Sequence, residues 1–86
     1  MTKQEKFLTK LLSGRSDNNI EFNDLCDLLS KFGFELRVKG DHHIFYKKDI
    51  EEIINIQPLN AKVKAYQVKQ VRSLVLKYKF GIEDDE

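Results

Sequence analysis

Residues 39–46 read Lys-Gly-Asp-His-His-Ile-Phe-Tyr and contain the two histidines of the chain, His42 and His43. Imidazole is the side chain whose ordinary titration lies nearest neutral pH, so an exposed histidine can give or take a proton in a reaction. Lysines beside such a ring could hold a phosphate and offset the negative charge that develops on it. The segment is therefore compatible with acid–base chemistry on a phosphate ester, with metal binding, or with purely structural histidines.

The spacing of apolar residues predicts the elements that position this segment. Helical spacing predicts helices over residues 3–12, 23–32 and 64–78, the second beginning at Asn23 as its cap and ending at Gly33. Between the last two helices the apolar period changes to two and predicts strands over 34–39, 42–47 and 51–57, the last ended by Pro58. The expected fold is α+β in the order α-α-β-β-β-α, a three-stranded antiparallel meander with helices on one face.

The Gly40-Asp41 pair has glycine at the first central position of a two-residue turn, which is typical of a type II′ hairpin. Such a turn places Lys39 opposite His42 and Val38 opposite His43, and directly opposed residues project from the same face. His43 and Phe45 are then expected to point toward the helices together with Phe34, Leu36 and Val38. His42 is expected to lie on the open face beside Lys39 and Arg37, and Ile44 and Tyr46 share that face.

This arrangement argues against a metal site, because adjacent histidines on opposite faces cannot easily share one ion. The chain has no other histidine, and its one cysteine, Cys26, is not at ligand spacing from them. Cys26 cannot form an internal disulfide and sits in a leucine-rich stretch, so we expect a buried structural thiol rather than a nucleophile. No metal and no cofactor are predicted.

Charge is unevenly distributed along the chain. The formal net charge is +1, but residues 37–82 carry a net +6 and residues 83–86, Glu-Asp-Asp-Glu, carry −4. A basic body behind an acidic tail (residues 81–86) is compatible with binding to nucleic acid, although most basic faces are only solvated. No apolar run approaches a membrane span, and the charged N-terminus does not have the pattern of a signal peptide. We expect one domain over residues 1–86 in a reducing cytoplasm.

Three stretches together resemble the HicA family of bacterial toxins: FGFELRVKGDHHIFY, the isoleucine-rich EEIINIQP, and YQVKQVRSLVLKY. The resemblance covers residues 22–80 and leaves residues 1–21 as an N-terminal helical extension. It implies a fold similar to the double-stranded-RNA-binding domain. It also implies the toxin component of a type II toxin–antitoxin system, a ribosome-independent mRNA interferase that halts translation and is neutralised by a HicB-like antitoxin.

The resemblance also assigns roles at the turn. The family's catalytic histidine corresponds to His42 and its turn glycine to Gly40, whereas Asp41 stands where the family usually has serine. The Asp41 carboxylate could hold the imidazole or repel RNA phosphate. The leading hypothesis is a metal-independent endoribonuclease in which His42 acts as general base on a ribose 2′-hydroxyl or as general acid to the leaving oxygen.

Other residues are candidates for contacting RNA or the antitoxin. The candidates for holding the RNA backbone are Lys39, Lys62, Lys64 and Lys69, with Lys47 and Lys48 at the far end of the hairpin as weaker ones. The candidates for antitoxin contact are Arg37, Ile44 and Tyr46. Base-specific cutting is not expected, because the sequence predicts no row of exposed aromatic residues for stacking. The alternative functions are an RNA-binding module without catalysis and a domain that binds only proteins.

Overall fold

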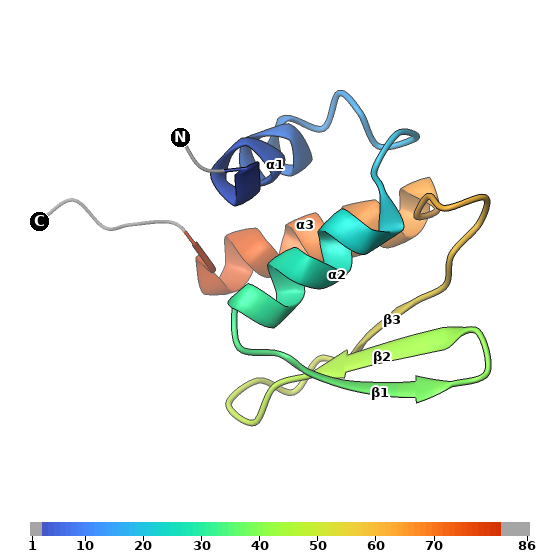
Figure 1. The fold of residues 1–86 in the computed structure, drawn as a ribbon. Helices are drawn as coiled ribbons and strands as arrows, with labels where there is room; N and C mark the ends of the chain where they lie inside the picture. The colour runs from blue at the N-terminus through green and yellow to red at the C-terminus, as the bar shows by residue number, and fades with distance from the viewer. Residues whose placement is uncertain (1–2, 82–86) are drawn as a thin grey trace, which may run out of the picture.

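Three helices lie on one side of a three-stranded antiparallel sheet (Figure 1). The computed structural model describes residues 3–81, and the predicted acidic residues 83–86 lie outside that range. The elements are α1 (Lys3–Ser13), α2 (Phe22–Lys31), β1 (Glu35–Lys39), β2 (His42–Tyr46), β3 (Ile54–Ile56) and α3 (Ala65–Tyr78). The predicted fold class and element order are confirmed. No helix within residues 3–81 is long and apolar enough to cross a membrane.

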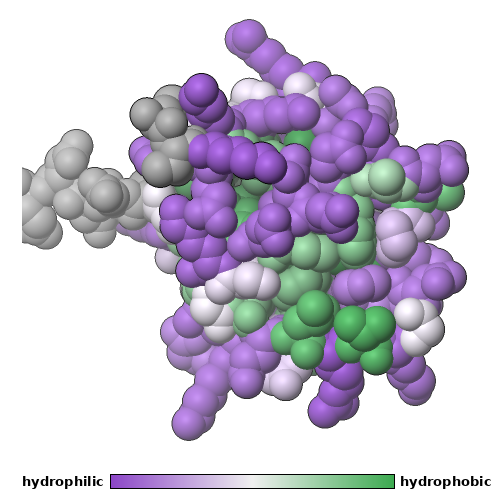
Figure 2. All heavy atoms as spheres, in the orientation of Figure 1, coloured by the Kyte–Doolittle hydropathy of each residue, from purple (hydrophilic) through white to green (hydrophobic). Residues whose placement is uncertain are grey.

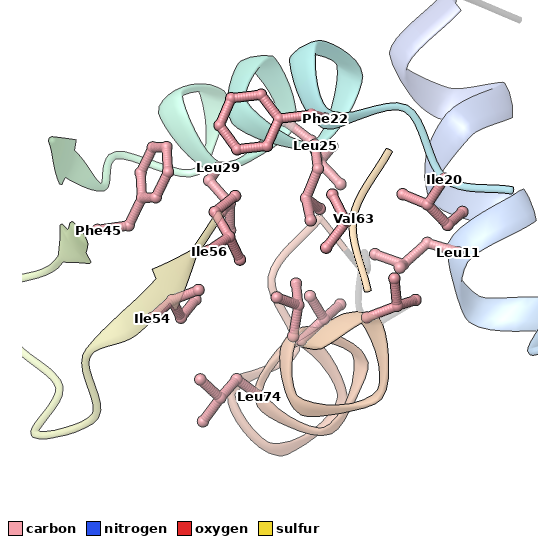
Figure 3. Close-up of a cluster of buried hydrophobic side chains, with 14 of the residues drawn as sticks. Leu11, Ile20, Phe22, Leu25, Leu29, Phe45, Ile54, Ile56, Val63 and Leu74 are labelled. Atoms are coloured by element: carbon pink, nitrogen blue, oxygen red, sulfur yellow. The ribbon is translucent and has the colours of Figure 1, made fainter. Parts of the chain in front are cut away.

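The core fills the space between the helices and the two strands β2 and β3 (Figure 3). Phe45 of β2 and Ile54 and Ile56 of β3 point toward α2 and α3 and are fully or almost fully buried. Each such side chain contributes roughly 1.5–3 kcal/mol of burial free energy. The same cluster includes Phe7 and Leu11 of α1, so the N-terminal helix shares the core with the rest of the domain.

An ion pair joins the segment after α1 to α3. The guanidinium of Arg72 contacts both carboxylate oxygens of Asp17, at 2.7 and 3.1 Å, and donates a further hydrogen bond to the carbonyl of Leu11 at 3.3 Å. The bonds from Arg72 hold the pKa of the Asp17 carboxyl below its usual value. This planar, two-pronged contact fixes the end of α1 against α3.

Helix α2 begins one residue earlier than predicted, and Asn23 does not cap it. The N-cap residue is Glu21, whose side chain makes no capping bond because it contacts the ammonium group of Lys62 at 2.5 Å. The amide of Phe22 instead donates to the carbonyl of Ala61 at 2.9 Å. A backbone segment from the loop before α3 therefore replaces the side-chain cap that local sequence suggested.

Strand β3 is shorter than predicted, spanning residues 54–56 rather than 51–57. The preceding residues form turns, with the amide of Ile50 bonded to the carbonyl of Lys47 at 3.2 Å. Glu52 points toward α3, where its carboxylate accepts hydrogen bonds from Lys77 at 2.6 Å and from the Tyr78 hydroxyl at 2.5 Å. These contacts draw residues 50–52 away from the sheet and toward the end of α3.

Leu36 and Val38 lie on the predicted face of the sheet, but the helices do not cover them. Both are on the helix side of the sheet by register, yet they are 45% and 55% exposed. The reason is that the helices cover β2 and β3, whereas β1 is the outer strand and every one of its residues is exposed. Hydrophobic side chains accordingly reach the surface in the lower part of Figure 2, where the sheet lies, below mainly hydrophilic helices.

Acid should weaken the contact of Glu52 with α3. The bonds from Lys77 and then Tyr78 lower the pKa of Glu52 from 4.5 to about 2. A carboxyl whose pKa is lower in the folded protein than in the unfolded chain stabilises the fold at pH values above the pKa of the unfolded state. This contribution is lost as the pH falls through the pKa of the folded state. We expect Glu52→Gln to lower the melting temperature near neutral pH but to have little effect near pH 2. Thermal melts across that range test this, with the exposed neighbour Glu51→Gln as control; a pH-independent difference would contradict it.

Candidate active site on the sheet

The turn between β1 and β2 has the predicted two residues. Gly40 has φ of +60°, whereas Asp41 is not in the left-handed region, as a type II′ turn requires. Nothing lies within 4 Å of the position of a Cβ at Gly40, so glycine is needed there for its backbone conformation and not for space. The register is Lys39 opposite His42 and Val38 opposite His43, which confirms the predicted pairing.

His43 packs against α2. Its ring is half-buried and meets the ring of Phe22 edge to face, with centroids 4.7 Å apart. Its Nδ1 lies 3.3 Å from the carbonyl oxygen of Asp41, and because a carbonyl only accepts, Nδ1 donates. The packing on α2 and the local hydrogen bond agree with the expected role of a partly buried, locally bonded histidine.

His42 lies on the opposite face and is exposed. Its Nδ1 is 3.2 Å from the side-chain oxygen of Asn55 on β3. An amide oxygen accepts hydrogen bonds, so Nδ1 carries the proton and Nε2 keeps its lone pair in the neutral ring. Nε2 has no hydrogen-bond partner among residues 3–81. Asn55 thus orients an exposed imidazole and leaves its Nε2 without a hydrogen bond to the described residues.

A hollow of about 270 Å³ lies beside His42, between the sheet and the first turns of α3. Asn55 and Gln57 line it from the β3 side, and Tyr66, Gln67 and Gln70 line it from α3. Gln67 is buried and joins the two elements, because its Nε2 donates to the Asn55 carbonyl at 3.3 Å and its Oε1 accepts from the Gln57 amide at 3.5 Å. This shared hollow makes α3 part of the site.

Sequence reasoning missed these five residues. One usable signal was present, since Asn55 and Gln57 alternate with Ile54 and Ile56 in the sequence and so are expected on the face away from the core. Tyr66 and Gln70 are four apart and therefore neighbours on one face of α3. Their approach to His42 depends on the packing of α3 against β3, which sequence spacing does not specify.

The residues predicted for antitoxin contact share a surface. Arg37, Ile44 and Tyr46 line a depression of about 400 Å³ together with Ile53, which the sequence did not indicate. Arg37 is directly opposite Ile44 in the register, and Ile44 is directly opposite Asn55. The depression and His42 are therefore on the same face of the sheet.

The predicted lysines are only partly brought together. Lys39 is exposed and directly opposite His42, and Lys64 is the N-cap residue of α3, two positions before Tyr66. Neither has an ion-pair partner within the described chain. Both are placed to add positive charge around the site.

The other candidate lysines lie elsewhere or are already paired. Lys62 bonds Glu21 and, at 2.6 Å, the side-chain oxygen of Asn19. Lys47 pairs with Asp49 at 3.0 Å beyond the end of β2, and Lys48 lies exposed in the same turn. Lys69 is an exposed residue of α3 and does not line the hollow beside His42. These four contribute less directly to the surface around His42.

Cys26 packs against the core and lies outside the candidate site. Burial raises the pKa of the half-buried Cys26 thiol to about 11, so the thiol stays protonated and unreactive at neutral pH. Within residues 3–81, no three histidine, cysteine or acidic side chains come together as a metal site would require.

An exposed, oriented histidine on a small α+β domain defines a candidate acid–base site, and comparison with known families supplies its context. Residues 22–78, more than half of the chain, match the family described as the HicA toxin of bacterial toxin–antitoxin systems. The chain therefore belongs to the HicA toxin family, and membership implies an antitoxin partner. Comparisons with curated proteins and with solved structures find no match.

The two histidines should differ in their effect on stability. We expect His43→Ala to lower the free energy of unfolding by about 1–3 kcal/mol, because it removes a half-buried ring and its contact with Phe22. His42→Ala is the matched control and should change the free energy of unfolding by less than about 0.5 kcal/mol, since the ring of His42 is exposed. Urea denaturation of both variants measures the difference. Equal losses would contradict the assignment of the two rings to different roles.

Proposed function

We propose that this HicA-family protein is an mRNA endoribonuclease that works in the cytoplasm without a metal ion, with His42 as its catalytic residue. One observation carries the proposal: His42 is exposed on the open face of the sheet with Nδ1 held by Asn55 and Nε2 unengaged. Membership of a toxin family supports a nuclease-type activity. The core of residues 22–80 would carry the activity, and residues 1–21 would be a stabilising extension.

The chemistry follows from the orientation of the ring. In the neutral form, Nε2 takes the proton of a ribose 2′-hydroxyl, and the 2′-oxygen attacks the neighbouring phosphorus. The bond from the 2′-oxygen to phosphorus forms, the bond from phosphorus to the 5′-oxygen breaks, and the leaving oxygen takes a proton from solvent. The products are a 2′,3′-cyclic phosphate and a 5′-hydroxyl. Neither a metal ion nor a covalent enzyme intermediate is required.

The neighbouring charges suit a phosphate at this position. Lys39 is opposite His42 on the same face, and Arg37 lies two residues before Lys39 on β1. Positive groups fixed near the phosphate offset the negative charge that grows on its oxygens during attack. Asp41 is exposed in the turn, and its side chain has no hydrogen bond to either histidine within residues 3–81. Its carboxylate therefore faces solvent, and Asn55 rather than Asp41 holds His42.

Removing the His42 ring should abolish RNA cleavage without unfolding the protein. We expect His42→Ala to lose both growth arrest on induced expression in bacteria and cleavage of RNA by the purified protein. Loss of a general base typically costs about 10²–10⁴-fold in rate. His43→Ala, assayed below its melting temperature, is the matched control and should still cut. Retained RNA binding without cleavage by the wild type would instead favour a non-catalytic RNA-binding module.

The proposed antitoxin, a HicB-like protein, should cover the face that carries His42. That face combines Arg37 and Lys39 with the apolar surface of Ile44 and Tyr46, so an acidic partner with apolar anchors fits it. Complementary charge speeds association, whereas buried apolar contacts slow release.

Charge reversal on the sheet should therefore weaken antitoxin capture. We expect Lys39→Glu to lower the affinity for the antitoxin, mainly by slowing association, and to weaken RNA binding as well. Lys6→Glu, on the exposed side of α1, is a matched charge reversal away from the sheet and should have little effect, as should reversal of Asp84 and Asp85. Surface plasmon resonance at two salt concentrations measures this. An unchanged association rate for Lys39→Glu would place the antitoxin on another surface.

A further inference from the structure

The hollow beside His42 has a chemical character that proton transfer alone does not explain. Besides His42, its lining consists of four carboxamide side chains and one phenol ring, with no charged group. Tyr66 is 64% exposed although it is a large aromatic residue at the start of a well-packed helix. An exposed aromatic ring offers a flat face on which a nucleobase can stack. The sequence alone did not lead us to expect base contacts, but the position of this ring beside the proposed catalytic residue favours them.

We propose that this hollow is a nucleobase subsite, in which Tyr66 stacks on the base next to the cleaved phosphate and Gln70 and Gln57 contact the edge of that base. The inference rests on the proposed ribonuclease function for the identity of the substrate. In this arrangement Tyr66 is a binding residue that accepts any base, and Gln70 is the specificity-determining residue. Asn55 and His42 lie at the border with the reaction centre.

The available hydrogen-bonding groups favour a base over a phosphate. A carboxamide offers both a donor and an acceptor, which matches the edge of a nucleobase, whereas a phosphate presents acceptors only. Within residues 3–81, the side chains of Gln57 and Gln70 have no hydrogen bond, so both are free to bind. The side chain of Gln67 already bonds the backbone at Asn55 and Gln57, so it fixes the position of α3 beside the hollow.

The size and position of the hollow agree with one base. Its volume of about 270 Å³ is just below that of pockets that enclose a drug-sized ligand, roughly 300–1,000 Å³, and it is open to solvent on one side. Asn55 connects the hollow with the reaction centre at His42, because it lines the hollow and its side-chain oxygen also holds Nδ1 of His42. A nucleotide whose base enters the hollow therefore presents its own ribose and phosphate to His42.

Binding of a non-cleavable RNA tests the stacking directly. The probe is a short single-stranded RNA of mixed sequence with 2′-fluoro riboses, which lack the attacking hydroxyl, and fluorescence anisotropy gives its affinity for the wild-type protein and its variants. Stacking of one base corresponds to about a 5- to 150-fold difference in affinity, so Tyr66→Ala should weaken binding by that factor. Tyr66→Phe keeps the ring and should restore most of it. Leu76→Ala, 53% exposed farther along α3, is the matched control and should bind like the wild type.

Mapping of cut sites separates the base contact from the stacking. Stacking accepts any base, so Tyr66→Ala should slow cleavage at all sites alike, whereas Gln70→Ala should relax the preference for one base beside the cut. Affinity and cleavage that are the same in Tyr66→Ala as in the wild type would overturn the subsite. A wild type that binds RNA through Tyr66 but never cuts would overturn the ribonuclease function and leave the subsite standing.

Discussion

The two-residue turn at Gly40-Asp41 is the constraint on which the site depends. With the turn at this length, β1 and β2 pair so that Lys39 is opposite His42 and Val38 is opposite His43. Because side chains alternate along a strand, one histidine packs on α2 and the other faces the open side of the sheet. A one-residue slip would exchange the two rings, placing His43 in solvent and His42 against Phe22.

The second determinant is the attachment of α3 to β3. Gln67 is the one buried polar side chain among the described residues, and it bonds one backbone group of β3 and one directly after that strand. This contact fixes the start of α3 beside the open face, whereas the pairing of Glu52 with Lys77 and Tyr78 fixes its other end. The sheet supplies His42 and Asn55, and α3 supplies two amide side chains and the exposed ring of Tyr66. The site therefore forms where the two elements meet.

Most of the fold and half of the site could be predicted from local patterns. The change of period at Phe34 and the Gly-Asp turn were sufficient for the element order, the hairpin register and the opposite faces of the histidines, because these depend on near neighbours in sequence. The exposure of Leu36 and Val38 was not predictable, since alternation specifies a face but not whether a helix covers it. The cap of α2 and the hollow lined by Tyr66 depend on contacts between residues tens of positions apart, which a single sequence does not reveal.

The chemical identity of the cut ends tests the central claim most directly, namely that His42 activates a ribose 2′-hydroxyl without a metal ion. The purified protein is incubated with a defined RNA in excess EDTA, and the products are analysed by mass spectrometry. The expected result is cleavage that leaves a 2′,3′-cyclic phosphate and a 5′-hydroxyl, and no cleavage where the ribose at the cut is 2′-deoxy. Products with a 3′-hydroxyl and a 5′-phosphate, or activity that EDTA abolishes, would contradict the account.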